Sequence, residues 1–334
     1  MRRTLTWILA GLLFLVLLWL CLFTGTVNIP IDETARILLG QTGGKESWSY
    51  IVLELRLPST VVAILSGASL GVAGLLLQTA FRNPLAGPSI LGVSTGASFG
   101  VALLTLLLPG ILAPAFASII GAALGAVAVI VMLLAFSMVI RSSVMLLIVG
   151  IMVSYLTSSA ISLMNFYATQ EGVHSFVIWG LGNYSGVGLQ YLLLFSTVTV
   201  ALLIVSLFLV KPLNALLLGE QYAANVGISV NRSRNVILLV SGGLVAIVTA
   251  FCGPIAFIGL AIPHFARLVF KTSNHKLLLP AVIVTGALTG LFTLWVAALP
   301  GDKGMLPLNA ITPFIGVPVV LYIILNRRRI NYFN

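Results

Sequence analysis

The chain alternates long apolar stretches with short polar segments over almost its whole length. Apolar runs of 18 or more residues recur, each long enough to cross a hydrocarbon core of about 30 Å as a helix. The runs lack the alternation of apolar and polar residues that a membrane-spanning barrel strand requires. The pattern therefore predicts an all-α integral membrane protein.

Charged residues divide this pattern into ten predicted crossings, with both termini in the cytoplasm. Of the 17 Lys and Arg residues, 13 then fall inside, as the positive-inside rule requires. Six of the seven acids fall outside, and Glu220 is the only acid assigned to the cytoplasmic face. About 32 residues remain for two crossings between Arg234 and Arg267, fewer than two full spans need. We therefore expect a short or broken helix beginning at GPIAFIGLAIPHFAR.

Composition agrees with a membrane protein. The 334 residues are 60% hydrophobic and 7% charged, with a mean hydropathy of +1.16, whereas about a quarter of the residues in soluble domains are charged. In a membrane protein, basic residues first indicate how the chain is oriented across the membrane, so the net charge of +10 is not taken as a sign of nucleic-acid binding. The N-terminal MRRTLTWILAGLLFLVLLWLCLFTG imitates a signal peptide but offers no small-x-small cleavage site, so we interpret it as the first transmembrane helix.

Small residues recur four positions apart within several apolar runs, which predicts that helices pack closely there. Proline and glycine also interrupt the segments RNPLAGPSILGVSTG and PLNAITPFIGVP. Such breaks are tolerated in a membrane only where protein or a water-filled cavity satisfies the backbone, which favours a translocation path. The closely packing glycines are expected to be Gly67, Gly71, Gly92, Gly96, Gly100, Gly121, Gly125, Gly286 and Gly290.

The chain lacks the groups that would power transport or catalysis. No predicted span carries Asp, Glu, Lys or Arg near its middle, whereas ion-coupled carriers usually need an ionisable group or a bound ion there. The segment GQTGGKES departs from the phosphate-loop pattern and is interpreted as an outer turn. The three histidines and two cysteines have no metal-ligand spacing, so no metal site and no catalytic residue is predicted.

One polar island, LGEQYAANVGIS at 218–229, stands between two apolar spans. Gly219 and Glu220 can begin a short helix, because an acid near the N-terminus is favourable to the helix dipole. Gly227 is a natural C-terminal stop. The predicted helix is barely two turns long.

This helix should be amphipathic. Tyr222 and Val226 lie four positions apart and share a face, with Ala223 beside them. Two interpretations stay open on spacing alone: an element that docks to a cytoplasmic partner, or a solvated loop that dips into the membrane interface.

Residues 56 to 100, RLPSTVVAILSGASLGVAGLLLQTAFRNPLAGPSILGVSTGASFG, resemble the FecCD family of permeases. These are the membrane subunits of ABC importers for iron-siderophores, haem and vitamin B12. Three further motifs in the family's order extend the resemblance over nearly the whole chain: LGEQYAANVGISV, GPIAFIGLAIPHFARL and LPLNAITPFIGVPVVLYIIL. The resemblance implies a vitamin B12 permease-like bundle of ten helices per subunit and a dimeric permease.

The resemblance also implies a role for the polar island. The family's coupling helices fit a groove of the ATPase subunit and convert nucleotide-driven closure into movement of the permease. The cytoplasmic coupling loop is then expected at about 211–234, and the outer loop at about 26–56. The implied coupling residues are Leu218, Gly219, Glu220, Tyr222, Ala223, Ala224, Val226 and Gly227.

On the outer side, Arg56 resembles the family's basic residue that pairs with a glutamate of the substrate-binding protein. Ser59 stands where many members have a second basic residue, and the outer arginine often found before the last span is missing. Lys303 is a candidate to supply that lost charge.

On the cytoplasmic side, four residues fall where the family constricts the pathway. Packing or helix capping is the alternative role for each of them. They are Asn83, Leu85, Ser142 and Ser143.

We therefore expect residues 1–334 to form a single permease domain in the bacterial inner (cell) membrane. It would move a metal chelate from an outer binding protein to the cytoplasm as a homodimer with two ATPase subunits. ATP and Mg would bind those ATPases, so this chain needs no cofactor, and it has no role with nucleic acid. An ion-coupled secondary transporter is the alternative; a membrane-embedded enzyme would need a polar catalytic cluster, and none is found in the sequence.

Overall fold

The computed structural model describes residues 2–41, 44–108, 110–140, 142–301 and 304–325, which are helical wherever they are regular. Seven segments are long and apolar enough to cross a membrane, and three shorter apolar helices accompany them. Together they match the number of crossings that the charge pattern predicts. The all-α membrane fold is therefore confirmed.

The long helices are α1 (Arg2–Phe23), α4 (Leu57–Ala80), α6 (Pro114–Val139), α7 (Ser143–Tyr167), α9 (Leu189–Leu207), α12 (Val230–Cys252) and α14 (His275–Ala298). The shorter apolar helices are α5 (Val93–Ala102), which a π-helical turn at Leu103–Leu107 extends, α13 (Ile258–Phe270) and α15 (Leu308–Leu325). The remaining elements are α2 (Ile31–Leu38), α3 (Glu46–Tyr50), a π-helical turn at Ile51–Arg56, α8 (Gln170–Gly180), a 3-10 turn at Tyr184–Gly186, α10 (Val210–Leu217) and α11 (Glu220–Asn225).

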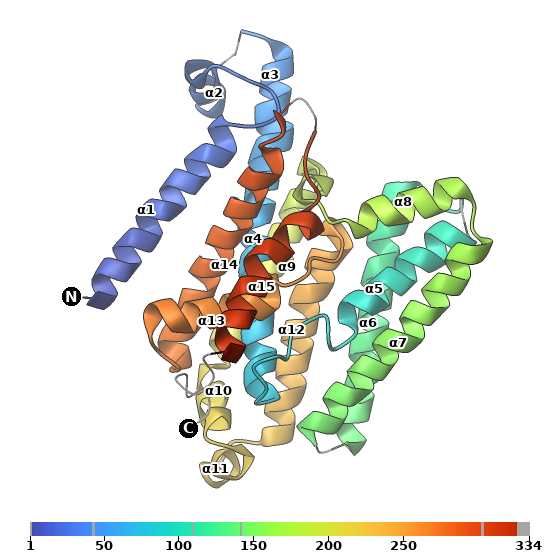
Figure 1. The fold of residues 1–334 in the computed structure, drawn as a ribbon, viewed down its shortest axis with the longest axis vertical. Coiled ribbons are helices and arrows are strands. Elements are labelled where there is room, and N and C mark those ends of the chain that lie inside the picture. The colour runs from blue at the N-terminus through green and yellow to red at the C-terminus, as the bar shows by residue number, and fades with distance from the viewer. Residues whose placement is uncertain (1, 42–43, 109, 141, 302–303, 326–334) are drawn as a thin grey trace.

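The helices α4, α12 and α14 form the centre of the bundle (Figure 1). On one side α1 leans against α14, and on the other side α5, α6, α7 and α8 form a second group. The short helices α2 and α3 close one end of the molecule, while α10 and α11 lie at the opposite end. We call these the α2 end and the α11 end.

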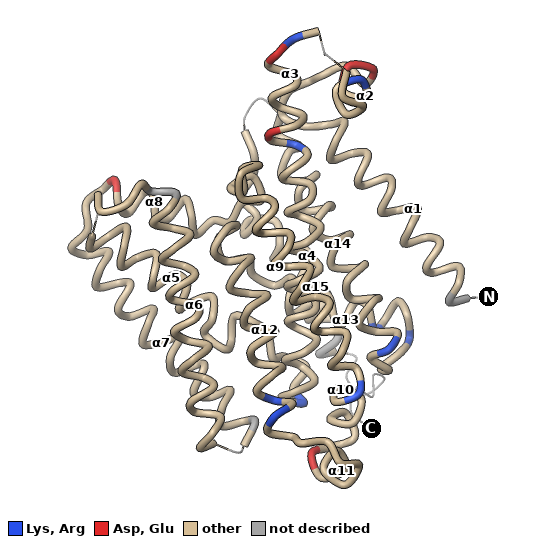
Figure 2. Tube along the Cα trace, turned by 180° about the vertical axis from the view of Figure 1, so that it is seen from behind, with Lys and Arg blue, Asp and Glu red and all other residues tan. Residues whose placement is uncertain are grey.

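Charged positions of the described residues gather toward these two ends, with Glu171 on α8, and the middle of the central helices has none (Figure 2). Basic residues dominate the α11 end, where Glu220 is the acid on α11 itself. This distribution confirms that no described span carries an ionisable Asp, Glu, Lys or Arg near its middle. A hydrocarbon layer can therefore surround the bundle between its ends without burying a charge in lipid.

Glycines allow two pairs of helices to cross at backbone contact. A Cβ added at Gly67 on α4 would overlap the carbonyl oxygen of Gly286 on α14. In the same way, a Cβ at Gly100 on α5 would overlap the carbonyl of Gly121 on α6. Close approach lets the helices gain packing contacts that a lipid environment does not otherwise drive. The predicted glycine packing is confirmed at these crossings.

A non-helical segment precedes α13, as the short spacing before Arg267 predicts. Gly253 has φ +74° and ends α12, and the chain then runs without helix until Ile258. The Asn309 side chain forms hydrogen bonds with backbone groups of this non-helical segment. Its Oδ1 accepts from Ala256 N at 3.0 Å, and its Nδ2 donates to the Pro254 carbonyl at 2.7 Å. Irregular backbone is thus covered by protein, the condition under which a membrane tolerates it.

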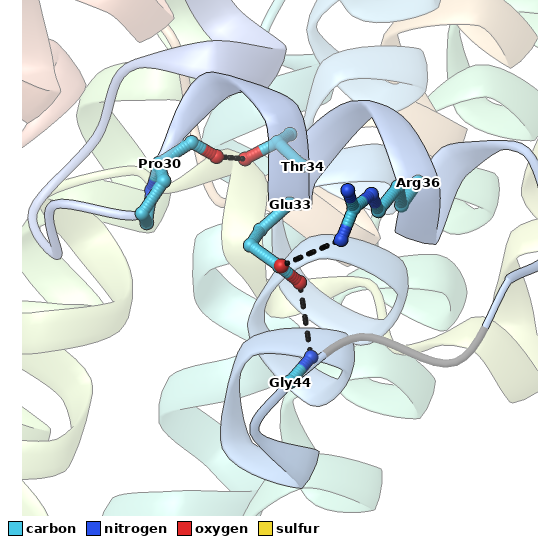
Figure 3. Close-up of polar contacts among 5 residues, drawn as sticks. All are labelled: Pro30, Glu33, Thr34, Arg36 and Gly44. Carbon is cyan, nitrogen blue, oxygen red and sulfur yellow. Dashed lines mark hydrogen bonds and ion pairs between the residues drawn. The ribbon is translucent and has the colours of Figure 1, made fainter.

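The α2 end is held by one acidic side chain. Glu33 Oε1 accepts from the Arg36 guanidinium at 3.3 Å, and Oε2 accepts from Gly44 N at 2.9 Å (Figure 3). The Thr34 hydroxyl donates to the Pro30 carbonyl at 3.2 Å within the same turn. Both oxygens of Glu33 are therefore used to fold the segment that joins α1 to α4.

Candidate functional site

The polar island folds into the short helix that its sequence predicts. Gly219 precedes α11 with φ +115°, a conformation that favours glycine because a side chain would be strained there. Glu220 is the first residue of the helix, and Asn225 is the last. Gly227 follows with φ +81° and turns the chain toward α12. The beginning and the glycine stop of the predicted helix are both confirmed.

The α11 helix presents an apolar face to solvent. Ala223 is fully buried against the bundle, whereas Tyr222 is 49% exposed and Val226 is 57% exposed. Leu218, just before the helix, is also exposed. Ala224 is exposed too, but it lies two positions from Tyr222 and from Val226 and so points away from them around the helix. Ala223, predicted beside Tyr222 and Val226, faces the bundle instead. We call Leu218, Tyr222 and Val226 the α11 apolar face. Its apolar side chains lie among charged groups at the end of the molecule, which is typical of a surface that binds another protein.

An ion pair fixes α11 on the bundle. Arg234 Nη2 on α12 donates to Glu220 Oε1 at 2.7 Å. The Arg234 side chain is only 3% exposed, while that of Glu220 is 45% exposed. A buried guanidinium needs a nearby acceptor, so this carboxylate balances Arg234 and holds the beginning of α11 in place. Glu220 therefore has a structural role that its sequence position alone does not reveal.

A recess of about 870 Å³ lies beside α11. It brings Ser142, at the start of α7, together with Arg82, which follows α4, and with the first turn of α11. A coupling residue and a predicted gate residue thus share one surface. The residues lining the recess are Phe81, Arg82, Ser142, Val144, Leu218, Gly219, Glu220, Gln221, Tyr222 and Asn225.

The four predicted gate residues take different positions. Ser142 caps α7 by accepting from Met145 N at 3.4 Å, and Ser143 is the first residue of that helix. Asn83 Oδ1 accepts from Leu85 N at 2.9 Å, which closes the turn after α4 and leaves the Leu85 side chain 43% exposed. Ser142 lines the recess, whereas Asn83 and Leu85 are not among the described residues that line it. Capping is therefore the visible role of Ser142 and Asn83, and their part in a gate stays a prediction.

A buried chain of polar groups connects α10 to the bundle centre. His275 is fully buried at the start of α14, and its Nδ1 lies 2.9 Å from Asn214 Oδ1 on α10. The backbone N of His275 donates to the same oxygen at 2.9 Å. An amide oxygen only accepts, so Nδ1 carries the ring proton and Nε2, 2.9 Å from Thr79 Oγ1 on α4, can accept from that hydroxyl. We call Thr79, His275 and Asn214 the polar relay.

A second polar contact lies next to the relay. Arg267 Nη1 on α13 donates to Gln78 Oε1 on α4 at 2.8 Å, and Gln78 Nε2 donates to the Leu260 carbonyl at 3.1 Å. His264 Nε2 lies 2.7 Å from the Pro84 carbonyl, in the turn that Asn83 closes. Together with the relay, these bonds join α4, α10, α13 and α14 at the α11 end, in addition to apolar packing.

The predicted outer docking residues lie at the opposite end. The Arg56 side chain is buried, and its guanidinium donates to the carbonyls of Leu22, at 3.1 Å, and Val27. This placement differs from a surface docking residue, so pairing with a binding protein stays a prediction for Arg56. Ser59 donates to the Leu55 carbonyl at 2.7 Å. Lys303 lies outside the described residues.

Several residues at the α11 end were not singled out as site residues from the sequence. In the sequence, Arg82 and Arg234 indicate only the inner side of the membrane, and no motif marks Asn214 as a site residue. An isolated polar residue within an apolar segment, as Asn214 is in VKPLNALL, was the available signal for the relay. Its partner is 61 positions away, so spacing alone could not have identified it.

The described residues contain no group of three or more His, Cys, Asp and Glu that could hold a metal ion. Cys21 and Cys252 are both free and buried. Cys21 Sγ lies 3.3 Å from the Leu291 carbonyl, and Cys252 Sγ lies 3.5 Å from Ser66 Oγ. Each cysteine therefore packs between helices, as the sequence predicts.

Comparisons with known proteins agree with this geometry. The FecCD transport family matches residues 13–326. The chain is 34% identical to the vitamin B12 import system permease protein BtuC of Citrobacter koseri, over 83% of this chain and 84% of the relative. The Salmonella typhi protein of the same name is 32% identical, with the same shares covered.

A solved structure is similar over almost the entire length. It is described as an inward-facing conformation of a metal-chelate type ABC transporter, with a TM-score of 0.82 and 28% identity. The alignment covers 96% of this chain and 97% of that one. The long apolar helices and these relatives identify a multi-pass transport protein of the bacterial inner membrane. The chain belongs to the FecCD transport family.

Proposed function

We propose that this chain is the permease subunit of an ABC importer that moves a metal chelate into the cytoplasm, driven by separate ATPase subunits. The α11 apolar face carries the proposal, because Tyr222 and Val226 are exposed at the charged end of a membrane protein. Burying such side chains against a partner is favourable by about 25 cal/mol per Å² of apolar area. The ATPase would bind this face, with the α11 end in the cytoplasm.

The polar relay supports transmission from α11 to the pathway. Asn214 lies on α10, which leads directly into α11, and His275 joins it to α14. Thr79 extends the connection to the last turn of α4. A displacement of α11 would thus move the ends of two central helices together, because the bonds of the relay are directional and His275 at its centre is fully buried.

A second copy of the chain would complete the pathway beside α7. This helix is largely unburied within the subunit, yet one face carries Tyr155, Ser158, Ser162 and Asn165 at helical spacing. Tyr155 on this face is 70% exposed. Polar groups facing lipid are costly, so this face is better placed against water or another subunit. A homodimer would pair two such faces around the translocation path.

The substrate is assigned by class only. The BtuC relatives import vitamin B12, and the structural neighbour is of the metal-chelate type. Iron-siderophores, haem and cobalamin are the chelates that we propose for this chain. An outer binding protein would deliver them already captured, so the uncharged pathway needs little affinity of its own. Tight binding of a chelate by the isolated permease would contradict that view.

The proposed assembly is tested by co-purification with the partner ATPase subunit. Wild-type permease should retain the ATPase through size-exclusion chromatography. Ala224→Glu places a charge on the exposed surface of α11 and should abolish retention. Ser273→Glu, an exposed change at the same end but outside α11, is the matched control and should retain the ATPase. Equal retention by both variants would reject α11 as the docking element.

A further inference from the structure

A cavity of about 200 Å³ lies at the α2 end, where α1, α4 and α14 meet. Its lining includes the hydroxyl-bearing residues Thr24 and Ser59 and the apolar residues Leu294 and Trp295. Arg56 contributes the charge. The lining therefore combines one cation, hydroxyl groups and apolar side chains.

Among the described residues, Arg56 is incompletely satisfied. Its side chain is buried, with the residue only 7% exposed, and Gly25 packs so closely that an added Cβ would lie 3.0 Å from the guanidinium nitrogens. The guanidinium has five N–H donors, and its bonds in this structure go to the carbonyls of Leu22 and Val27. Among the described residues, no carboxylate is paired with Arg56. A buried cation without an anion is unfavourable, so the cavity is suited to an anionic group.

The position of the cavity indicates the source of that anion. Cys21 and Leu294 line it from the last turns of α1 and α14, so it lies about one turn inside the ends of two spans. Trp295 lies at the same level, where tryptophan is enriched at the boundary between hydrocarbon and headgroups. An anionic group at this depth, joined to an apolar chain, is the chemistry of a phospholipid.

The volume excludes the transported molecule. At about 200 Å³ the cavity is smaller than the ~300 to 1,000 Å³ of pockets that enclose a whole small ligand. A metal chelate does not fit, whereas a phosphate with its glycerol linkage does. The acyl chains would lie outside the cavity, in the bilayer.

We propose that this cavity binds the phosphate of an anionic phospholipid. The free N–H groups of Arg56 donate to phosphate oxygens, and the glycerol linkage packs on Trp295. The bound lipid would neutralise the guanidinium and fill the space between α1 and α14. This site is separate from the α11 end and does not depend on the proposed transport function.

Native mass spectrometry of the full-length protein tests the proposal. Delipidated protein in mild detergent is incubated with phosphatidylglycerol, with zwitterionic phosphatidylethanolamine, or with inorganic phosphate as a competitor. Wild type should retain one phosphatidylglycerol per chain, in preference to phosphatidylethanolamine and unaffected by inorganic phosphate. Arg56→Gln should reduce retention by about tenfold or more, since charge-assisted hydrogen bonds are lost.

Two variants separate the cavity from general effects. Ala298→Phe fills the cavity while keeping Arg56, and it should also lose the lipid if the cavity is the site. Arg36→Gln removes an exposed arginine from the same end and should leave retention unchanged. The proposal is overturned if both Arg56→Gln and Ala298→Phe retain the lipid like wild type. Displacement of the lipid by inorganic phosphate would overturn the proposal in favour of a free-anion site. Wild-type lipid retention by Arg56→Gln, together with loss of the substrate-binding protein, would overturn it in favour of a docking site.

Discussion

The buried guanidinium of Arg234 on α12 donates to the half-exposed carboxylate of Glu220 on α11 over 2.7 Å. This pair connects the surface helix to a central helix of the bundle. It also explains why an acid occurs on a basic face of the molecule: without Glu220, Arg234 would be buried beside fewer acceptors. The acid thus positions α11, while its exposed neighbours are available to a partner.

Removing this carboxylate should loosen α11. Glu220→Ala is expected to lower the free energy of unfolding by about 1.5 to 3 kcal/mol, the range for hydrogen bonds to charged groups. It should also uncouple ATP hydrolysis from transport while membrane insertion is kept. Thermal unfolding in detergent and ATPase-coupled uptake are the measurements. Glu171→Ala, an exposed acid on α8, is the control, and equal effects of both changes would contradict the role of the pair.

The exposed and buried alanines of α11 should behave in opposite ways. Ala224→Glu is expected to keep the unfolding temperature of wild type, because Ala224 is exposed, and to lose coupled transport. Ala223→Glu buries a charge at a fully buried position and should destabilise the protein. Unfolding temperatures and uptake rates of the two variants check this. Full transport by Ala224→Glu would count against a docking role for α11.

Breaking the polar relay should affect stability and coupling together. His275→Phe removes the two ring hydrogen bonds to Asn214 and Thr79, each worth about 0.5 to 1.5 kcal/mol. The backbone N of residue 275 still donates to the Asn214 oxygen, and the Thr79 hydroxyl can still donate to the Leu75 carbonyl. The ratio of ATP hydrolysed to substrate transported should rise. The matched control is His174→Phe, an exposed histidine on α8. A destabilised His275→Phe variant with an unchanged ratio would show that the relay is structural and transmits nothing.

The glycine crossing of α4 and α14 is testable with one substitution. Gly67→Leu is expected to prevent folding, because even its Cβ would overlap the Gly286 carbonyl. Overpacking of this kind typically costs about 1 to 3 kcal/mol or more. Gly11→Leu on α1 meets nothing within 4 Å and should fold normally. Yields of monodisperse protein in detergent measure both outcomes. Comparable yields of the two variants would contradict the close crossing.

Cysteine labelling tests the proposed orientation. Cys21 and Cys252 are buried, so a single cysteine introduced on the surface should dominate labelling. Ala224→Cys should react with an impermeant thiol reagent only in inside-out vesicles, and Arg36→Cys only from the outer face. The opposite pattern would reverse the assignment of cytoplasmic termini.

The sequence was informative where local chemistry decides structure. The acid and glycines around 219–227 predicted the bounds of α11, and the short distance between Arg234 and Arg267 predicted the reduced helix α13. Charge placement predicted the number of crossings because lipid penalises ionisable groups in any fold. Each of these signals depends on neighbouring residues or on the membrane alone.

The sequence alone did not predict the contacts between segments that are far apart in the chain. Nothing local distinguishes Arg234, buried and paired, from an exposed basic residue at the membrane edge. Arg56 likewise reads as an outer charge, yet Gly25 allows it to fold against the carbonyls that follow α1. The relay between Asn214 and His275 depends on how α10 packs beside α14, which the sequence does not state.

Transport in proteoliposomes tests the central claim most directly. The permease is reconstituted with the proposed ATPase and binding-protein partners, and uptake of labelled cobalamin, haem or iron-siderophore is followed with and without ATP. We predict uptake of one of these chelates that requires ATP and the ATPase and that Ala224→Glu abolishes. Uptake by the permease alone, driven by a proton or sodium gradient, would contradict the account and identify an ion-coupled transporter.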